Sequence, residues 1–84
     1  MSKPVELLGT KGCHLCEVAE RMVRRLASEA GVQILYLDIA DDDTLVEAYG
    51  MRIPVLRTQP ADKVNELGWP FTEEEFLTWA NQFA

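Results

Sequence analysis

The segment V5-E-L-L-G-T-K-G-C-H-L-C-E-V-A-E-R-M-V-R-R-L26 joins a short apolar run, a turn and the beginning of a long amphipathic run. The apolar run, residues 5–8, is typical of a buried strand and ends at Gly9. From Cys16 onward apolar residues recur at three- and four-residue spacing, as in a helix with one buried face. We expect this strand, turn and helix to open the fold, with Gly31 ending the helix.

The next stretch predicts another strand and a short helix. Residues 32–39, V-Q-I-L-Y-L-D-I, are rich in β-branched and aromatic side chains and predict the strand. The acidic run 41–43 is interpreted as a helix start rather than a metal cluster, because acidic groups suit a helix N-terminus. Thr44 and Glu47 have the spacing of a capping box for that helix.

The last third of the chain predicts a hairpin and a final helix. Residues 53–56 and 63–67 are the expected strands, and residues 60–62 the turn between them. After a break at Gly68-Trp69-Pro70, a capping box at Thr72 and Glu75 opens the last helix. The order βαβαββα implies a right-handed parallel crossover followed by antiparallel strands. We therefore predict an α/β fold with a four-stranded mixed sheet and helices on both faces.

Composition bounds the possible functions. The 84 residues suit one domain, 1–84, and 48% are hydrophobic, which is enough for a core. A net charge of −6 weighs against nucleic-acid binding, which usually needs a basic patch. No segment approaches about 20 apolar residues and no signal-peptide pattern opens the chain, so we expect a cytoplasmic protein without a membrane partner. Few aromatic residues are left for an interface, so a monomer is expected.

Both cysteines, Cys13 and Cys16, lie where the first helix is predicted to begin. Unpaired amides there stabilise a thiolate, and C-x-x-C thiols at such places have pKa values of about 3.5 to 7.5, against about 8.5 for free cysteine. Lys11 would add positive charge, and His14 in the spacer would either favour the Cys13 thiolate or have no role. Cys13 would then attack a disulfide, and Cys16, one turn further on, would resolve the mixed disulfide.

The cysteine pair has three other interpretations. A structural disulfide that closes so short a loop would add only about 2 kcal/mol to the stability of the fold. Structural zinc needs four ligands, and His14 is the sole histidine, so no metal site is predicted. The third, two small core residues, stays open, although the turn at Gly12 favours exposure of Cys13.

A second informative stretch is Y49-G-M-R-I-P-V55. Proline has no N–H for a sheet, so Pro54 belongs at a strand start, and an Ile–Pro bond can be cis at modest cost. Together with K11-G-C-H-L-C16, the strand ending at Asp38, the hairpin and the last helix, this stretch resembles glutaredoxin-like proteins of the thioredoxin superfamily. The resemblance covers nearly the whole chain and implies a thioredoxin-like fold.

The resemblance also implies roles for particular residues. Pro54 would be cis and face Cys13, and the backbone of Ile53 would be free to pair with an extended substrate. Lys11 matches the lysine that holds the glutathione carboxylate. No tightly bound cofactor is implied, and glutathione is a candidate reductant. Residues 68–72, Gly-Trp-Pro-Phe-Thr, lack the second glycine and the aspartate with which glutaredoxins contact the amino end of glutathione.

The sequence thus predicts an enzyme, a small thiol–disulfide oxidoreductase. Its substrate would be a disulfide-containing protein or a glutathione mixed disulfide, and its electrons would come from glutathione or a reductase. Two alternatives are an iron–sulfur or metal carrier that uses Cys13, and a binding module that keeps the fold without turnover. Trp69 and Phe71 are predicted to be core residues rather than an apolar lip for a protein substrate.

Overall fold

The computed structural model describes residues 3–58 and 65–82. Along the chain the elements are β1 (Lys3–Gly9), α1 (His14–Ala30), β2 (Val32–Asp38), η1 (Ile39–Asp41), α2 (Asp43–Tyr49), β3 (Val55–Thr58), β4 (Glu66–Gly68) and α3 (Glu73–Asn81). The predicted turn at residues 60–62 and the start of the predicted strand 63–67 lie outside the described residues.

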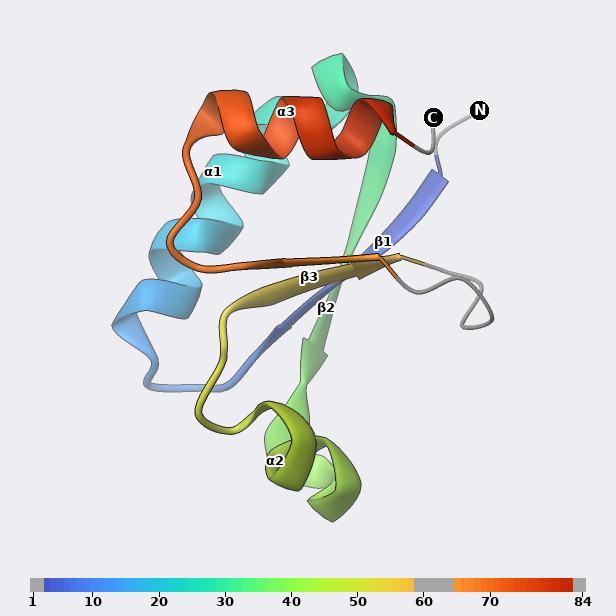
Figure 1. Cartoon of the computed structure of the whole chain (residues 1–84). Helices are drawn as coiled ribbons and strands as arrows, with labels where there is room; N and C mark the ends of the chain where they lie inside the picture. The colour runs from blue at the N-terminus through green and yellow to red at the C-terminus, as the bar shows by residue number, and fades with distance from the viewer. Residues whose placement is uncertain (1–2, 59–64, 83–84) are drawn as a thin grey trace.

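The four strands form one mixed sheet in the order β2-β1-β3-β4 (Figure 1). β1 and β2 are parallel and joined by α1, and their register runs from Lys3 opposite Val32 to Gly9 opposite Asp38. β3 is antiparallel to both β1 and β4, with Leu8 opposite Val55. The predicted parallel crossover and antiparallel edge are both confirmed.

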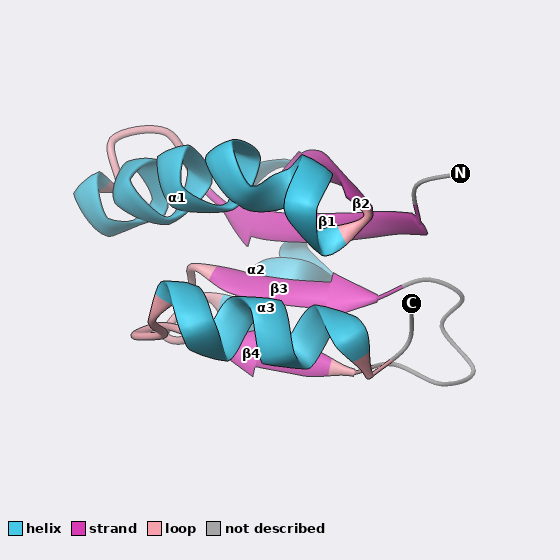
Figure 2. Ribbon diagram, turned by 90° about the horizontal axis from the view of Figure 1, so that it is seen from above, coloured by secondary structure: helices cyan, strands magenta, loops and turns pink. Residues whose placement is uncertain are grey.

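The helices cover both faces of the sheet, as predicted. Figure 2 shows α1 and α3 side by side on one face, with α2 behind the strands. Successive side chains of a strand point to opposite faces. Leu7 of β1 accordingly lies in the core under α1 and α3, whereas Leu8 packs with Tyr49 on the α2 side. Phe71 is buried in the core under α1 and α3, so its interpretation as a core residue is confirmed, whereas Trp69 is partly buried and packs against that core.

The start of the last helix and the end of the first helix follow the predicted chemistry. The Thr72 hydroxyl accepts from the amide of Glu75 at 3.0 Å, and the Glu75 carboxylate accepts from the amide of Thr72 at 2.8 Å, so the capping box is confirmed. Gly31 ends α1 in the left-handed conformation, with φ of 72°, which glycine adopts at little cost.

The start of α2 differs from the prediction. Its cap is Asp42, whose carboxylate accepts from the amides of Thr44 at 2.9 Å and Leu45 at 3.3 Å. The predicted capping box of Thr44 and Glu47 is therefore wrong. A carboxylate at the cap both accepts these bonds and places negative charge at the positive end of the helix, so the helix begins two residues earlier than a cap at Thr44 would allow.

Candidate redox site

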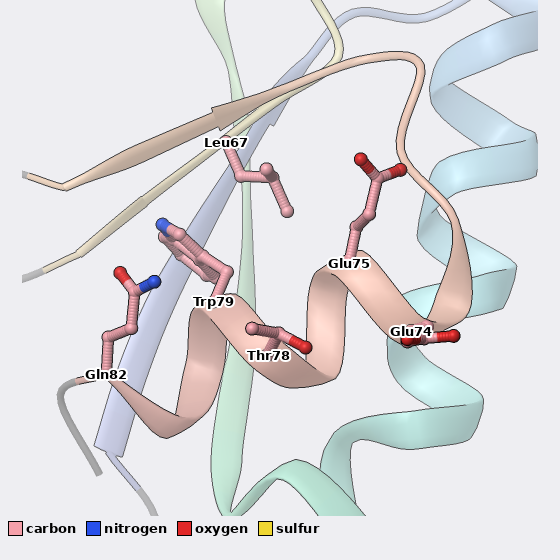
Figure 3. A pocket seen from close by; sticks show the side chains of 6 residues that line it. All are labelled: Leu67, Glu74, Glu75, Thr78, Trp79 and Gln82. Atoms are coloured by element: carbon pink, nitrogen blue, oxygen red, sulfur yellow. The ribbon is translucent and has the colours of Figure 1, made fainter.

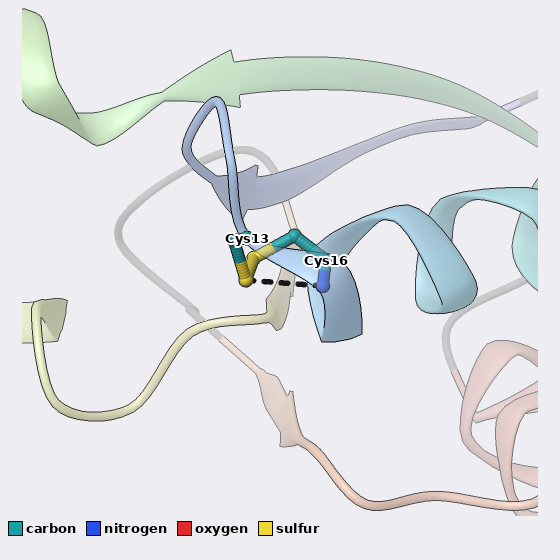
Figure 4. The surroundings of a disulfide bond; sticks show 2 residues. All are labelled: Cys13 and Cys16. Carbon is teal, nitrogen blue, oxygen red and sulfur yellow. Dashed lines mark hydrogen bonds between the residues drawn. A yellow bond between two sulfur atoms is a disulfide. The ribbon is translucent and has the colours of Figure 1, made fainter.

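The two cysteines form a disulfide at the first turn of α1 (Figure 4). Their Cα atoms are 5.2 Å apart. Cys13 is the N-cap residue of α1, and its sulfur accepts a hydrogen bond from the amide of Cys16 at 3.1 Å. Cys13 is half-buried, whereas Cys16 is 0% exposed. The interpretation of both cysteines as plain core residues is therefore wrong for Cys13.

The local sequence explains why the sulfur of Cys13 meets the helix start. Gly12 has a φ of 80°, a conformation that glycine takes far more readily than other residues. The chain turns there, and the amide of Cys13 donates to the carbonyl of Thr10 at 3.4 Å. The carbonyl of Cys13 then accepts from the amide of Glu17 at 3.2 Å, which begins the helical bonding. The Cys13 side chain thus faces amides that have no partner within the helix.

Cys16 packs closely on β1 at Gly9. A Cβ atom at Gly9 would lie 3.1 Å from both Sγ and Cβ of Cys16 and 2.7 Å from the hydroxyl oxygen of Tyr36. Gly9 is therefore the point where strand β1, the buried sulfur and Tyr36 of β2 meet. Sequence reasoning missed Tyr36 as a site residue. The feature that identifies Tyr36 as a site residue is the parallel register of β1 and β2, which puts Tyr36 opposite Leu7 on the α1 side of the sheet.

Tyr36 lies in a negatively charged environment. Burial raises the pKa of its hydroxyl, and the nearby carboxylates of Asp38, Glu20 and Glu17 raise that pKa further. These carboxylates come from β2 and from the first two turns of α1, the helix whose start carries the disulfide. The hydroxyl consequently keeps its proton at neutral pH and is able to donate a hydrogen bond.

The Ile53–Pro54 peptide bond is cis, and Pro54 is fully buried. Its carbonyl accepts from the amide of Trp69 at 3.1 Å. Because Leu8 pairs with Val55, continuing the antiparallel register by one residue brings Pro54 beside Gly9, the residue on which Cys16 packs. The topology therefore brings the two informative sequence stretches to one end of the sheet.

The backbone of Ile53 differs from the expectation. Its amide donates to the carbonyl of Tyr49 at 3.1 Å, so the prediction that this backbone is free to pair with a substrate is wrong for the N–H group. The physical reason is the tight turn after α2, where the amides of Arg52 and Ile53 both return to the Tyr49 carbonyl.

A polar cluster holds the loop that leads to Pro54. The Tyr49 hydroxyl and the Arg52 guanidinium both donate to the carboxylate of Glu66 in β4. The Arg52 guanidinium also lies 4.8 Å from the centre of the Tyr49 ring, a cation–π distance. The Tyr49 hydroxyl and then Arg52 lower the pKa of Glu66. The cluster therefore fixes the loop against the sheet edge.

The remaining predicted residues flank the disulfide. Lys11 is exposed in the turn before it, and His14 is the exposed first residue of α1. Within residues 3–58 and 65–82, no three His, Cys, Asp or Glu side chains gather to hold a metal ion. None of the helices in those residues is long and apolar enough to span a membrane.

A pocket of about 310 Å³ lies between β4 and α3 (Figure 3). Its walls are formed by Leu67, Glu74, Glu75, Thr78, Trp79 and Gln82. None of these residues belongs to the first turn of α1 or to the loop before β3, so the pocket shares no lining residue with the disulfide site.

The fold and the disulfide at the first helix define a protein of the thioredoxin-fold class, with a thiol–disulfide oxidoreductase-type role. The chain belongs to the Glutaredoxin-like domain (DUF836) family, which matches residues 4–80. No curated protein matches the sequence.

Solved structures agree with this assignment. The crystal structure of target protein XcR50 from X. campestris has 32% identity and a TM-score of 0.74, covering 93% of this chain and 96% of that one. Protein Ne2328 from Nitrosomonas europaea has 22% identity and a TM-score of 0.75, covering 94% and 92%. Thioredoxin 1 from Thermosipho africanus has 11% identity and a TM-score of 0.71, covering 95% and 92%. The last two likenesses show the fold alone.

Proposed function

We propose that the protein exchanges disulfides with a protein or a glutathione mixed disulfide, with Cys13 as the nucleophile and Cys16 as the resolving residue. The observation that carries this proposal is the difference between the two sulfurs. Cys13 is half-buried and its sulfur accepts the Cys16 amide at 3.1 Å, whereas Cys16 is 0% exposed. Cys13 is therefore the residue of the pair that a substrate disulfide can approach, and Cys16 is shielded from it.

The proposed reaction starts from the reduced dithiol. The Cys13 thiolate attacks one substrate sulfur, and the other substrate sulfur leaves as a thiolate that takes a proton from water. Cys16 then loses its proton and attacks the Cys13 sulfur, which releases the second substrate sulfur. Two electrons pass to the substrate, and the Cys13–Cys16 disulfide of the structure remains. Glutathione or a flavin-dependent reductase would return the electrons.

Exposed apolar side chains beside the site support a protein substrate. Leu15, inside the cysteine spacer, is 49% exposed, and Met51, in the loop that leads to Pro54, is 99% exposed. Exposed Lys11 would place a positive charge near the carboxylate of glutathione if that is the reductant. Parallel assays coupled to glutathione with glutathione reductase, and to thioredoxin reductase, decide which donor is used.

The first test is a pH titration of the Cys13 thiolate in a Cys16→Ser variant, followed by ultraviolet absorbance. We expect a pKa well below the value of about 8.5 for a free cysteine, because the sulfur faces the helix amides. A pKa equal to that of free cysteine would remove the basis for Cys13 as an activated nucleophile.

The second test traps the mixed disulfide. Cys16→Ser should accumulate a covalent adduct with a disulfide substrate, since nothing resolves it, and mass spectrometry should locate the adduct on Cys13. The matched variant Cys13→Ser should form little adduct, because Cys16 is buried. Equal trapping by both variants would contradict the assigned roles.

A further inference from the structure

Tyr36 of β2 is a polar side chain that lies near the buried sulfur of Cys16. The Tyr36 hydroxyl oxygen and the Cys16 sulfur lie 2.7 Å and 3.1 Å from one point, the position of a Cβ on Gly9. The Tyr36 hydroxyl oxygen and the Cys16 sulfur are therefore at most about 5.8 Å apart. Opening the disulfide frees the Cys16 side chain to rotate between staggered positions, and such a rotation would have to bring the sulfur into hydrogen-bonding distance of the hydroxyl.

We propose that the Tyr36 hydroxyl donates a hydrogen bond to the Cys16 sulfur in the reduced protein and so stabilises the thiolate that resolves the mixed disulfide. This inference rests on the proposed function and adds a residue to it. Cys16 is 0% exposed, and a buried thiolate without a donor is strongly disfavoured. The amide of Cys16 itself already donates to the Cys13 sulfur.

The negative charges around Tyr36 and Cys16 make a hydrogen-bond donor to the Cys16 sulfur more important. Glu17 and Glu20 of α1 and Asp38 of β2 all act on the Tyr36 hydroxyl, and their negative charge opposes a thiolate nearby. Exposed Lys11, in the turn before the helix, carries the opposite charge. Burial and the three carboxylates raise the Tyr36 pKa, so the hydroxyl keeps its proton throughout.

The step balances without any further reactant. The Cys16 thiol loses its proton to water. The Tyr36 hydroxyl donates a hydrogen bond to the negatively charged sulfur that remains. That sulfur attacks Cys13 and forms the Cys13–Cys16 bond while the bond from Cys13 to the substrate breaks. The departing substrate thiolate takes a proton from water, and Tyr36 is unchanged.

The test compares Tyr36→Phe with Tyr49→Phe, which removes the same atom from the other tyrosine of the chain. The Tyr49 hydroxyl donates to Glu66 rather than to a cysteine. In a Cys13→Ser background, Tyr36→Phe should raise the pKa of Cys16 by about one unit, as expected for losing one hydrogen bond to a charged group. With both cysteines present, resolution should slow about tenfold at neutral pH in Tyr36→Phe. In the Cys13→Ser background, Tyr49→Phe should leave the pKa of Cys16 unchanged.

A measurement on unaltered tyrosines covers the case in which Tyr36→Phe does not fold. In the Cys13→Ser protein, the ring proton signals of Tyr36 should shift with the titration of Cys16, while those of Tyr49 should not. An unchanged Cys16 pKa and resolution rate in a folded Tyr36→Phe, or Tyr36 signals that ignore the Cys16 titration, would overturn the inference.

The proposed function is tested separately in the same experiments. Attack by Cys13 is measured in Cys16→Ser with and without Tyr36→Phe, where no resolution occurs. Adduct formation at equal rates in both shows that Cys13 works as a nucleophile whatever Tyr36 does. Loss of adduct formation already in Cys16→Ser alone would count against the proposed function itself.

Discussion

Replacing Gly9 by alanine tests how tightly β1 packs under the redox helix. The new methyl group would lie 2.7 Å from the Tyr36 hydroxyl and 3.1 Å from the Cys16 sulfur, whereas ordinary contact is 3.4–4 Å. The tyrosine end can swing outward. Cys16 is fully buried and tied to Cys13, so it must shift together with the first turn of α1.

The expected magnitude is the difference of two terms. Overpacking of this kind lowers the free energy of unfolding by about 1–3 kcal/mol. Alanine also restricts the unfolded chain more than glycine does, which raises the free energy of unfolding by about 0.4–1 kcal/mol. We therefore expect Gly9→Ala to lower the free energy of unfolding of the oxidised protein by about 1.3 kcal/mol, the difference between the midpoints of the two ranges. Reduction lets the Cys16 sulfur rotate away, so the loss should be smaller in the reduced protein. Each 1.4 kcal/mol of that difference raises the reduction potential by about 30 mV.

Urea unfolding of the oxidised and reduced proteins measures both quantities. The matched control is Gly68→Ala in β4, because a Cβ there meets no atom within 4 Å. The control should be neutral or slightly more stable. If Gly9→Ala is as stable as Gly68→Ala in both redox states, the close contact between β1 and Cys16 is not a constraint and the reasoning fails.

Three further predictions concern stability, all measured by urea unfolding. The pKa of Glu66 is lowered from its ordinary value of 4.5, so its ionised form stabilises the fold above that pH and the contribution is lost as pH falls through the folded pKa. Glu66→Gln should thus be less stable than wild type at neutral pH, with a gap that closes below about pH 4.5; a constant gap would contradict this. Asp42→Ala should cost about 1 kcal/mol and Thr44→Ala little, and the reverse order would restore the cap assigned from sequence. Thr72→Ala should also cost about 1 kcal/mol, and Thr78→Ala, an exposed change inside the same helix, should cost almost nothing.

The parts of the fold that were predictable from sequence are those set by local patterns. The apolar spacing after Cys16 and the glycine at residue 31 define α1, and the capping box defines the start of α3. The same approach failed at α2, where two acceptors two residues apart competed. Sequence spacing favoured Thr44, and only the backbone geometry shows that the carboxylate of Asp42 reaches the amides first.

The parts of the site that were not predictable depend on contacts between distant segments. The cysteine pair is local and was found directly. Tyr36 comes near it only because β1 and β2 pair in parallel with Gly9 opposite Asp38. The engagement of the Ile53 amide depends in the same way on how the chain turns after α2. Neither register nor turn geometry can be read from a single segment, so these features required the structure.

The different roles proposed for the two cysteines follow from the helix period. The buried positions of α1 are Cys16, Ala19, Val23, Leu26 and Ala30, which form one stripe at spacings of three and four residues. Cys16 is the first member of that stripe, so its burial is set by the same packing that folds the domain. Cys13 lies three residues earlier, at the cap, where the chain has not yet entered the helix and its sulfur meets unpaired amides instead of the core. A spacer shorter or longer by one residue would move the second sulfur off the stripe, and both cysteines would then compete for the substrate.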